Sequence, residues 1–256
     1  MTDSLPLADV TELTDPASVL EHTQGDPFVR YDIRLPTLVP PVALGRAVAL
    51  VRIPKSRLRR PSLTFVGPAD DVEALIEWYT AHGLPEVAGA VTVERPLEPV
   101  LRRHVDVGTG GDWDWMWTTD EPAVLAEEAL LTELDDRRDA RDVLRLNEIG
   151  NPSAESEPGE GTTERWVGVR SGGELIAAAA MHRTTAGAPH LTGIVVHPDH
   201  RGRRLGLAMT GALTRTAVRQ DGVCTLGVNA DNDTAHRVYV GLGYRLAHAW
   251  ASRRLT

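Results

Sequence analysis

The stretch HLTGIVVHPDHRGRRLGLAM, residues 190–209, places a strand, a turn and the start of a helix in direct succession. Leu191–Val196 is apolar and partly β-branched, as expected of a strand, and Pro198 ends its pairing. Apolar residues then recur at helical spacing from Leu205 to Ala217, so a helix is predicted up to Gly222. This succession is typical of an α/β fold.

The turn between this strand and this helix has the properties of an anion site. Residues 202–207 present unpaired amide groups at a helix N-terminus, where the helix dipole favours negative charge. Gly202 and Gly206 let the backbone approach a bulky phosphate, and Arg201, Arg203 and Arg204 add charge-assisted contacts. The turn predicts a phosphate site; the alternative is an exposed basic start of a helix.

A second strand and helix follow in LGVNADNDTAHRVYVGLGY, residues 226–244. Val223–Val228 reads as a strand, and Asn232 caps a helix that closes near Gly243. Seven residues separate Asn232 from Tyr239, so both lie on nearly one helix face. Asn232 alone is explained as a helix cap, and Tyr239 alone as a core residue. Together with the phosphate turn, however, the two residues indicate coenzyme A chemistry.

The order of these motifs resembles the GNAT superfamily of acyl-CoA-dependent N-acyltransferases. The matching patterns are Val-x-Pro-x-x-Arg-Gly-x-x-x-Gly and Leu-x-Val-x-x-x-Asn-x-x-Ala-x-x-x-Tyr-x-x-x-Gly-Tyr. The match is close over about 55 residues and loose over residues 128–254. One departure is Arg204, which stands where the family has a glycine. We expect Arg204 to lie already in helical conformation, which an arginine tolerates.

The resemblance implies roles for individual residues. The backbone of Ile194, Val195 and Val196 would bind the pantetheine arm of acetyl-CoA, Asn232 would position the cofactor, and Tyr239 would lie near its sulfur. The residues that would hold the pyrophosphate are Arg201, Gly202, Arg203, Arg204, Leu205, Gly206 and Leu207.

Acyl transfer from a thioester to an amine needs a base, a polarised carbonyl and an acid for the thiolate. We predict Tyr239 as the acid, because its hydroxyl has an isolated pKa of about 10, close to that of a thiol. Backbone amides at Ile194 or Val195 would polarise the carbonyl. His190 is the predicted base; His182 and a chain of water molecules are the alternatives. The histidines at 182, 190, 197 and 200 fit no metal-ligand spacing, so no metal is expected.

The front half also resembles the first domain of two-domain members of the superfamily. We therefore predict a degenerate acyltransferase-like domain at residues 1–122 and the GNAT domain at 123–256, with α/β architecture and mixed sheets. Nothing in residues 1–120 repeats the phosphate turn, so one cofactor site is expected. Phe28–Arg34 reads as a strand, and Gly108–Gly111 as a loop.

Three tryptophans at 113, 115 and 117 alternate with period two and share one face of a strand. They either line the acceptor pocket, stacking on a cation or ring, or are buried between the two domains. Asp112 and Asp114 alternate with them and are expected to face solvent.

The composition of the chain bears on its partners and its location in the cell. The net charge of −9 argues against a nucleic-acid partner, and no apolar run reaches the length of a membrane span. The N-terminus MTDSLP lacks a signal pattern, and Cys224 is the single cysteine, so a cytoplasmic location is expected. Lys55 is the only lysine among 27 basic residues, which suggests a high-GC bacterial genome.

The leading interpretation is an N-acetyltransferase that acts on the amine of a small molecule, as a monomer or homodimer. The alternatives are a protein acetyltransferase for N-termini or lysines and a sensor that binds acetyl-CoA without turnover.

Overall fold

The computed structural model describes residues 10–54, 60–152 and 154–256. Residues 1–6, the stretch MTDSLP that lacks a signal pattern, lie outside these ranges. The chain forms two compact units: one comprises residues up to 114, 229–231 and 247–256, and the other residues 115–228 and 232–246. A single cut after residue 122 does not reproduce this division, because β6 (Val107–Thr118) and β12 (Arg245–Leu255) each contribute residues to both units.

The second unit contains a mixed sheet with the strand order β11-β10-β9-β8-β7. β10 and β11 run parallel, and the other neighbouring pairs are antiparallel. The strands are β7 (Thr132–Leu134), β8 (Arg165–Ser171), β9 (Glu174–Arg183), β10 (Pro189–Val196) and β11 (Cys224–Asn229). The helices are η2 (Ala126–Leu130), α5 (Ala140–Gly150), η3 (Pro198–His200), α6 (Leu205–Asp221) and α7 (Asp233–Gly241).

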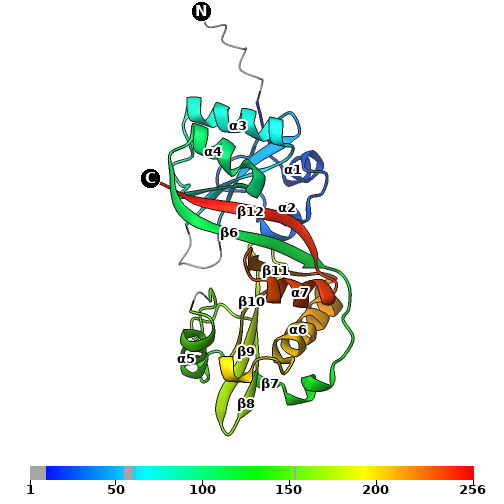
Figure 1. Ribbon diagram of the computed structural model, residues 1–256. Helices are drawn as coiled ribbons and strands as arrows, with labels where there is room; N and C mark the ends of the chain where they lie inside the picture. The colour runs from blue at the N-terminus through cyan, green and yellow to red at the C-terminus, as the bar shows by residue number, and fades with distance from the viewer. Residues whose placement is uncertain (1–9, 55–59, 153) are drawn as a thin grey trace, which may run out of the picture. The chain divides into compact units, whose positions relative to one another are not determined.

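Helices α5 and α6 lie on opposite sides of β9 and β10 (Figure 1). The side chains of β9 alternate between two cores: Ala177 and Ala179 pack with Leu213 of α6, and Ala178 packs with Leu146 of α5. Period-two alternation puts successive residues of a strand on opposite faces, so the buried residues of this strand, Leu175–Met181, are all apolar. Burial of its two faces between helices explains the run of four alanines from 177 to 180.

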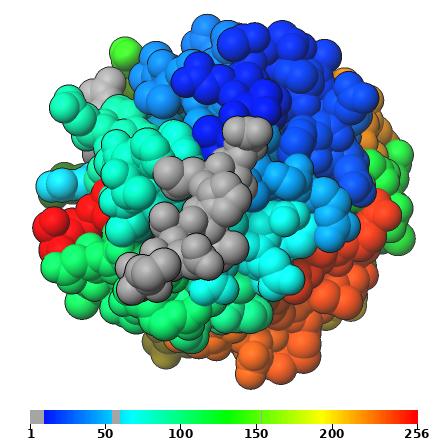
Figure 2. Space-filling model, turned by 90° about the horizontal axis from the view of Figure 1, so that it is seen from above, coloured from blue at the N-terminus to red at the C-terminus, as the bar shows by residue number. Residues whose placement is uncertain are grey.

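The first unit has the strand order β1-β2-β3-β4-β5-β12-β6. Its further strands are β1 (Thr11–Glu12), β2 (Val42–Leu44), β3 (Ala47–Arg52), β4 (Ser62–Val66) and β5 (Ala90–Glu94); its helices are α1 (Pro16–His22), α2 (Pro27–Asp32), α3 (Ala69–His82), η1 (Arg95–Leu97) and α4 (Glu98–His104). Helix α3 packs Leu75 and Ile76 into the core of this sheet, and the other side of the helix reaches the surface (Figure 2).

The prediction of a strand at Phe28–Arg34 is wrong, because Pro27–Asp32 is helix α2. Asp26 accepts a hydrogen bond from the Val29 amide at 3.0 Å, and Pro27 occupies the first helical turn. A capping carboxylate and a proline at the helix start outweigh the weak strand preference of a few apolar residues.

The prediction of a loop at Gly108–Gly111 is also wrong, because these residues lie within β6. A Cβ atom at Gly110 would stand 1.8 Å from the backbone oxygen of Ser252 on β12. The glycine therefore permits close approach of two backbones within the sheet, which is a recognised use of glycine in a strand.

Among the described residues, no helix combines the length and apolar character that a membrane span requires.

Candidate active site

The parallel strands β10 and β11 pair only where they begin. His190 lies opposite Thr225, and Leu191 lies opposite Leu226. In the described chain no later residue of β10 is paired with β11, although Val195 and Val196 still pair with β9. The two strands thus diverge along their length. An extended ligand can add to β10 at this edge as a further strand would, through main-chain hydrogen bonds.

A bulge at Gly193 produces this divergence. Between Thr192 and Val195 the chain advances three residues while its partner β9 advances two, so one residue of β10 is extra. Gly193 has φ of +58°, and a Cβ there would lie 2.6 Å from the Ser156 hydroxyl oxygen. The bulge also changes the facing of the strand: Leu191 packs toward α6, whereas Val195 packs toward α5. A glycine inside a predicted strand is a signal for a bulge, and the sequence prediction did not use it.

The turn after β10 leads through η3 into α6, as predicted. Gly202 has φ of +76°, and a Cβ there would meet no atom within 4 Å, so backbone conformation rather than space requires the glycine. Gly206 lies in the first turn of α6, where amides have no partner within the helix. The dipole of this 17-residue helix favours an anion at this end.

The three arginines of the turn have different surroundings. Arg201 donates to the carbonyl oxygens of Val196 at 3.3 Å and Gly150 at 3.0 Å, so it joins the end of α5 to the end of β10. Arg204 forms an ion pair with Glu127 at 3.2 Å. Arg203 is exposed. The sequence had not indicated Glu127, which approaches from a segment more than 70 residues earlier.

The expectation that Arg204 lies in helical conformation is wrong. Arg204 precedes the first residue of α6 and is left-handed, with φ of 58° and ψ of 12°. An L-residue with a side chain is strained there, whereas glycine is not. The strain gives a physical reason for the family's glycine at this position.

This strain can be measured by comparing two substitutions of Arg204. Arg204→Gly and Arg204→Ala both remove the ion pair with Glu127, but only glycine relaxes the left-handed backbone. We expect the glycine variant to exceed the alanine variant in free energy of unfolding by about 1 kcal/mol, the strain less the backbone entropy of glycine. Urea denaturation measures the difference. An alanine variant as stable as the glycine variant would contradict the prediction.

Asn232 and Tyr239 lie at the start and in the body of α7, as predicted. The Asn232 side chain accepts a hydrogen bond from the Ala235 amide at 3.1 Å, so it caps the helix. Tyr239 is 7% exposed and packs in the core that includes Leu205 and Tyr244. Burial raises the pKa of Tyr239 to about 12. Its hydroxyl therefore stays protonated across the pH range of ordinary assays, as a proton donor must be, but its pKa lies above the isolated value of about 10 on which the sequence prediction relied.

His190 lies at the start of β10, where this strand meets its neighbours on both sides. Its Nδ1 atom is 2.9 Å from the Thr225 hydroxyl oxygen on β11. On β9, His182 is its partner across the strands, and the two rings stack with centroids 5.2 Å apart and an interplanar angle of 10°. The structure thus brings together the two histidines that the sequence offered as alternative bases.

A cavity of about 360 Å³ lies beside His197, the residue that follows β10. His197 lines it together with residues of α5, among them Arg145 and Ile149, and with Glu174 at the start of β9. Its wall combines apolar and charged groups of both signs.

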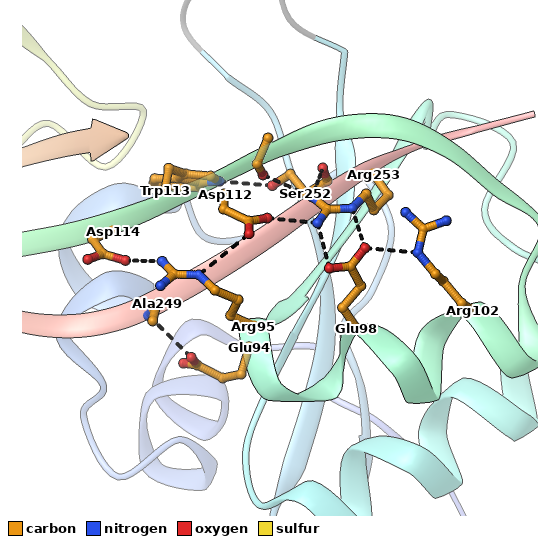
Figure 3. Close-up of polar contacts among 11 residues, drawn as sticks. Glu94, Arg95, Glu98, Arg102, Asp112, Trp113, Asp114, Ala249, Ser252 and Arg253 are labelled. Atoms are coloured by element: carbon orange, nitrogen blue, oxygen red, sulfur yellow. Dashed lines mark hydrogen bonds and ion pairs between the residues drawn. The ribbon is translucent and has the colours of Figure 1, made fainter. Parts of the chain in front are cut away.

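The tryptophans of β6 have separate environments. Trp115 is fully buried, and Trp117 lies beneath the Arg245 guanidinium, 4.5 Å from its ring centroid. The Trp113 indole donates to the Ser252 hydroxyl at 2.9 Å (Figure 3), and its ring lies 6.4 Å from that of Phe28.

Asp112 and Asp114 do not face solvent freely, which corrects that expectation. Asp114 is 7% exposed and pairs with Arg95, while Asp112 lies 2.7 Å from Arg253 (Figure 3). Glu98 also binds Arg253, at 2.6 Å. The partners are distant in sequence, so strand alternation alone could not reveal them.

One group of possible metal ligands occurs in the described part of the chain, and it lies in the first unit rather than among the histidines at 182–200. Glu73, Glu77 and His104 bring ligand atoms within 4.8 Å of one another. Glu73 is already paired with Arg103 at 2.6 Å, and this surface arrangement needs no ion to explain it.

Residues 125–244 match the model of the acetyltransferase (GNAT) family. No curated protein matches the chain.

Several solved structures share the fold at low identity. A GCN5-related N-acetyltransferase from Sphaerobacter thermophilus is 18% identical with a TM-score of 0.55, over 93% of this chain and 84% of that one. One from Kribbella flavida is 18% identical with a TM-score of 0.51, over 93% and 95%. An acetyltransferase of the GNAT family from Colwellia psychrerythraea is 11% identical with a TM-score of 0.56, over 97% and 100%.

Residues 125–244 are therefore a GNAT acetyltransferase domain, the class of enzyme that takes an acyl group from acyl-CoA. The structural likeness covers nearly the whole chain, so the predicted α/β fold with mixed sheets is confirmed. Two features of this chain are suited to acyl-CoA: the divergence of β10 from β11, and the turn before α6.

Proposed function

We propose that this protein transfers an acetyl group from acetyl-CoA to the primary amine of a small molecule. The observation that carries the proposal is the bulged strand β10, which leaves β11 after Leu191 and leads through η3 into the turn before α6. This arrangement suits a ligand with an extended, amide-bearing arm and a diphosphate at its end. Ile194, Val195 and Val196 would bind the arm, and residues 201–207 the diphosphate.

The proposed reaction divides its proton transfers between two side chains. The amine nitrogen attacks the thioester carbon, and His190 takes the proton that the nitrogen loses. An amide of Ile194 or Val195 stabilises the oxyanion that forms. The carbon–sulfur bond then breaks, and Tyr239 donates its proton to the departing thiolate. Asn232, through its cap, holds the start of the helix that carries Tyr239.

The location and assembly of the protein belong to the same proposal. We infer a cytoplasmic, bacterial enzyme without nucleic-acid or membrane partners, acting as a monomer or homodimer and without a metal.

Cys224 is buried, and burial raises the pKa of its thiol to about 12, so it is suited to packing rather than to reaction.

Two measurements test the proposal. Isothermal titration calorimetry with CoA should give a saturable heat, and a panel of amino acids, polyamines and aminoglycosides should include amines that release thiol from acetyl-CoA. Heat without thiol release from any amine, peptide N-terminus or lysine peptide would favour an acetyl-CoA sensor. Thiol release confined to peptides would favour a protein acetyltransferase. Absence of any heat would remove the proposed cofactor site.

A further inference from the structure

A chain of two hydrogen bonds runs from the ring of His190 into the protein interior. The Nδ1 atom of His190 is 2.9 Å from Thr225 Oγ1, and that oxygen is 2.9 Å from the carbonyl oxygen of Pro189. Thr225 is fully buried. His190 and Thr225 are register partners of the parallel strands, so the backbone pairing itself brings the two side chains together.

The chemistry of these three groups determines the direction of both hydrogen bonds. A carbonyl oxygen can only accept, so the single hydroxyl proton of Thr225 is donated to Pro189. The hydroxyl can then serve His190 only as an acceptor. The proton between the two side chains therefore belongs to Nδ1 of His190. In the neutral ring, the lone pair lies on the other nitrogen, Nε2.

We infer that Thr225 is a positioning residue that holds neutral His190 in the Nδ1–H tautomer, with Nε2 as the atom that accepts the proton of the amine. This inference rests on the proposed function, in which His190 is the base. The stack with His182 adds a second constraint, because a nearly parallel ring at 5.2 Å restricts the tilt of the imidazole plane. A base with one tautomer and one orientation loses less rate to unproductive states.

The tautomer can be observed directly by ¹⁵N NMR of the histidine rings in the full-length protein, with His190→Gln to assign the signal. In the wild type, neutral His190 should carry its proton on Nδ1. Thr225→Val keeps the shape of the side chain but removes the acceptor, so the proton should move wholly or partly to Nε2. Thr225→Ser should restore the wild-type signal. A proton on Nε2 in the wild type, or one that stays on Nδ1 in the valine variant, would overturn the inference.

The same variants have a kinetic readout once an acceptor amine has been found. Thr225→Val should lower kcat about tenfold, a part of the roughly 10²- to 10⁴-fold that a general base contributes, while KM for acetyl-CoA stays unchanged. Thr225→Ser should recover most of the rate. Thr64→Val is the matched control, because Thr64 is an equally buried strand threonine of the first unit whose hydroxyl bonds Ser62.

The proposed function and the positioning role of Thr225 can be refuted independently of each other. A wild type that binds CoA but releases no thiol with any amine would refute the proposed function, and the NMR signal would still decide the tautomer. An active wild type whose valine variant keeps full kcat would refute the role of Thr225 alone.

Discussion

Replacing Tyr239 with phenylalanine is expected to lower kcat for thiol release about 100-fold, with little change in the affinity for acetyl-CoA. General acid catalysis contributes about 10²- to 10⁴-fold, and the substitution removes only the hydroxyl that would protonate the thiolate. Because burial raises the pKa of Tyr239 to about 12, the wild-type hydroxyl is protonated throughout an assay between pH 6 and 10. Steady-state rates and calorimetry with CoA measure the two quantities.

The first unit supplies a matched control for this substitution. Tyr79 is 5% exposed, and burial likewise raises its pKa to about 12. Tyr79→Phe should therefore change the free energy of unfolding by a similar amount while leaving kcat unchanged. If Tyr239→Phe lost no more rate than Tyr79→Phe, Tyr239 could not be the acid.

The second large effect concerns the pH dependence of stability and comes from His248 on β12. This ring is 8% exposed and lies between two carboxylates, with Nε2 2.9 Å from Asp26 and Nδ1 2.5 Å from Glu94. It also stacks on Trp250 with centroids 4.3 Å apart. Burial disfavours the charged ring, but the hydrogen bonds to Asp26 and Glu94 outweigh it and raise the pKa of His248 to about 9.

A pKa above that of an unfolded histidine, about 6.5, makes the free energy of unfolding depend on pH. Below pH 6.5 the ring is protonated in both states, and its contribution is complete. Between pH 6.5 and 9 the unfolded chain loses the proton first, so stability falls. Across this window we expect a loss of roughly 3 kcal/mol from this one group. Urea denaturation at intervals between pH 6 and 9.5 measures it.

His248→Gln should remove most of this slope and destabilise the protein at pH 6, because it leaves two carboxylates without their cation. His82→Gln, at an exposed ring of α3, is the control and should keep the wild-type slope. Equal slopes in the wild type and in His248→Gln would show that the ring is not held as a cation.

The sequence by itself determined the parts of this protein that depend on neighbouring residues. Helix α7 begins after its Asn232 cap, and α6 ends at Gly222, which is left-handed. The strand, turn and helix at residues 189–221 were predictable because apolar period, proline and glycine act over a few residues. Three local predictions failed. Asp26 and Pro27 start a helix where a strand was expected, and sheet pairing extends β6 through the glycines at 108–111. Arg204 is left-handed rather than helical.

The tertiary structure decided how distant residues combine at the candidate site. Thr225 reaches His190 from 35 positions away, and Glu127 reaches Arg204 from 77. Asp114 is buried because Arg95 neutralises it. The bulge at Gly193 turns Val195 to the opposite face from the one that strict alternation predicts. Hydrogen-bond direction, charge pairing and strand register depend on which segments meet, and only the folded chain brings those segments together.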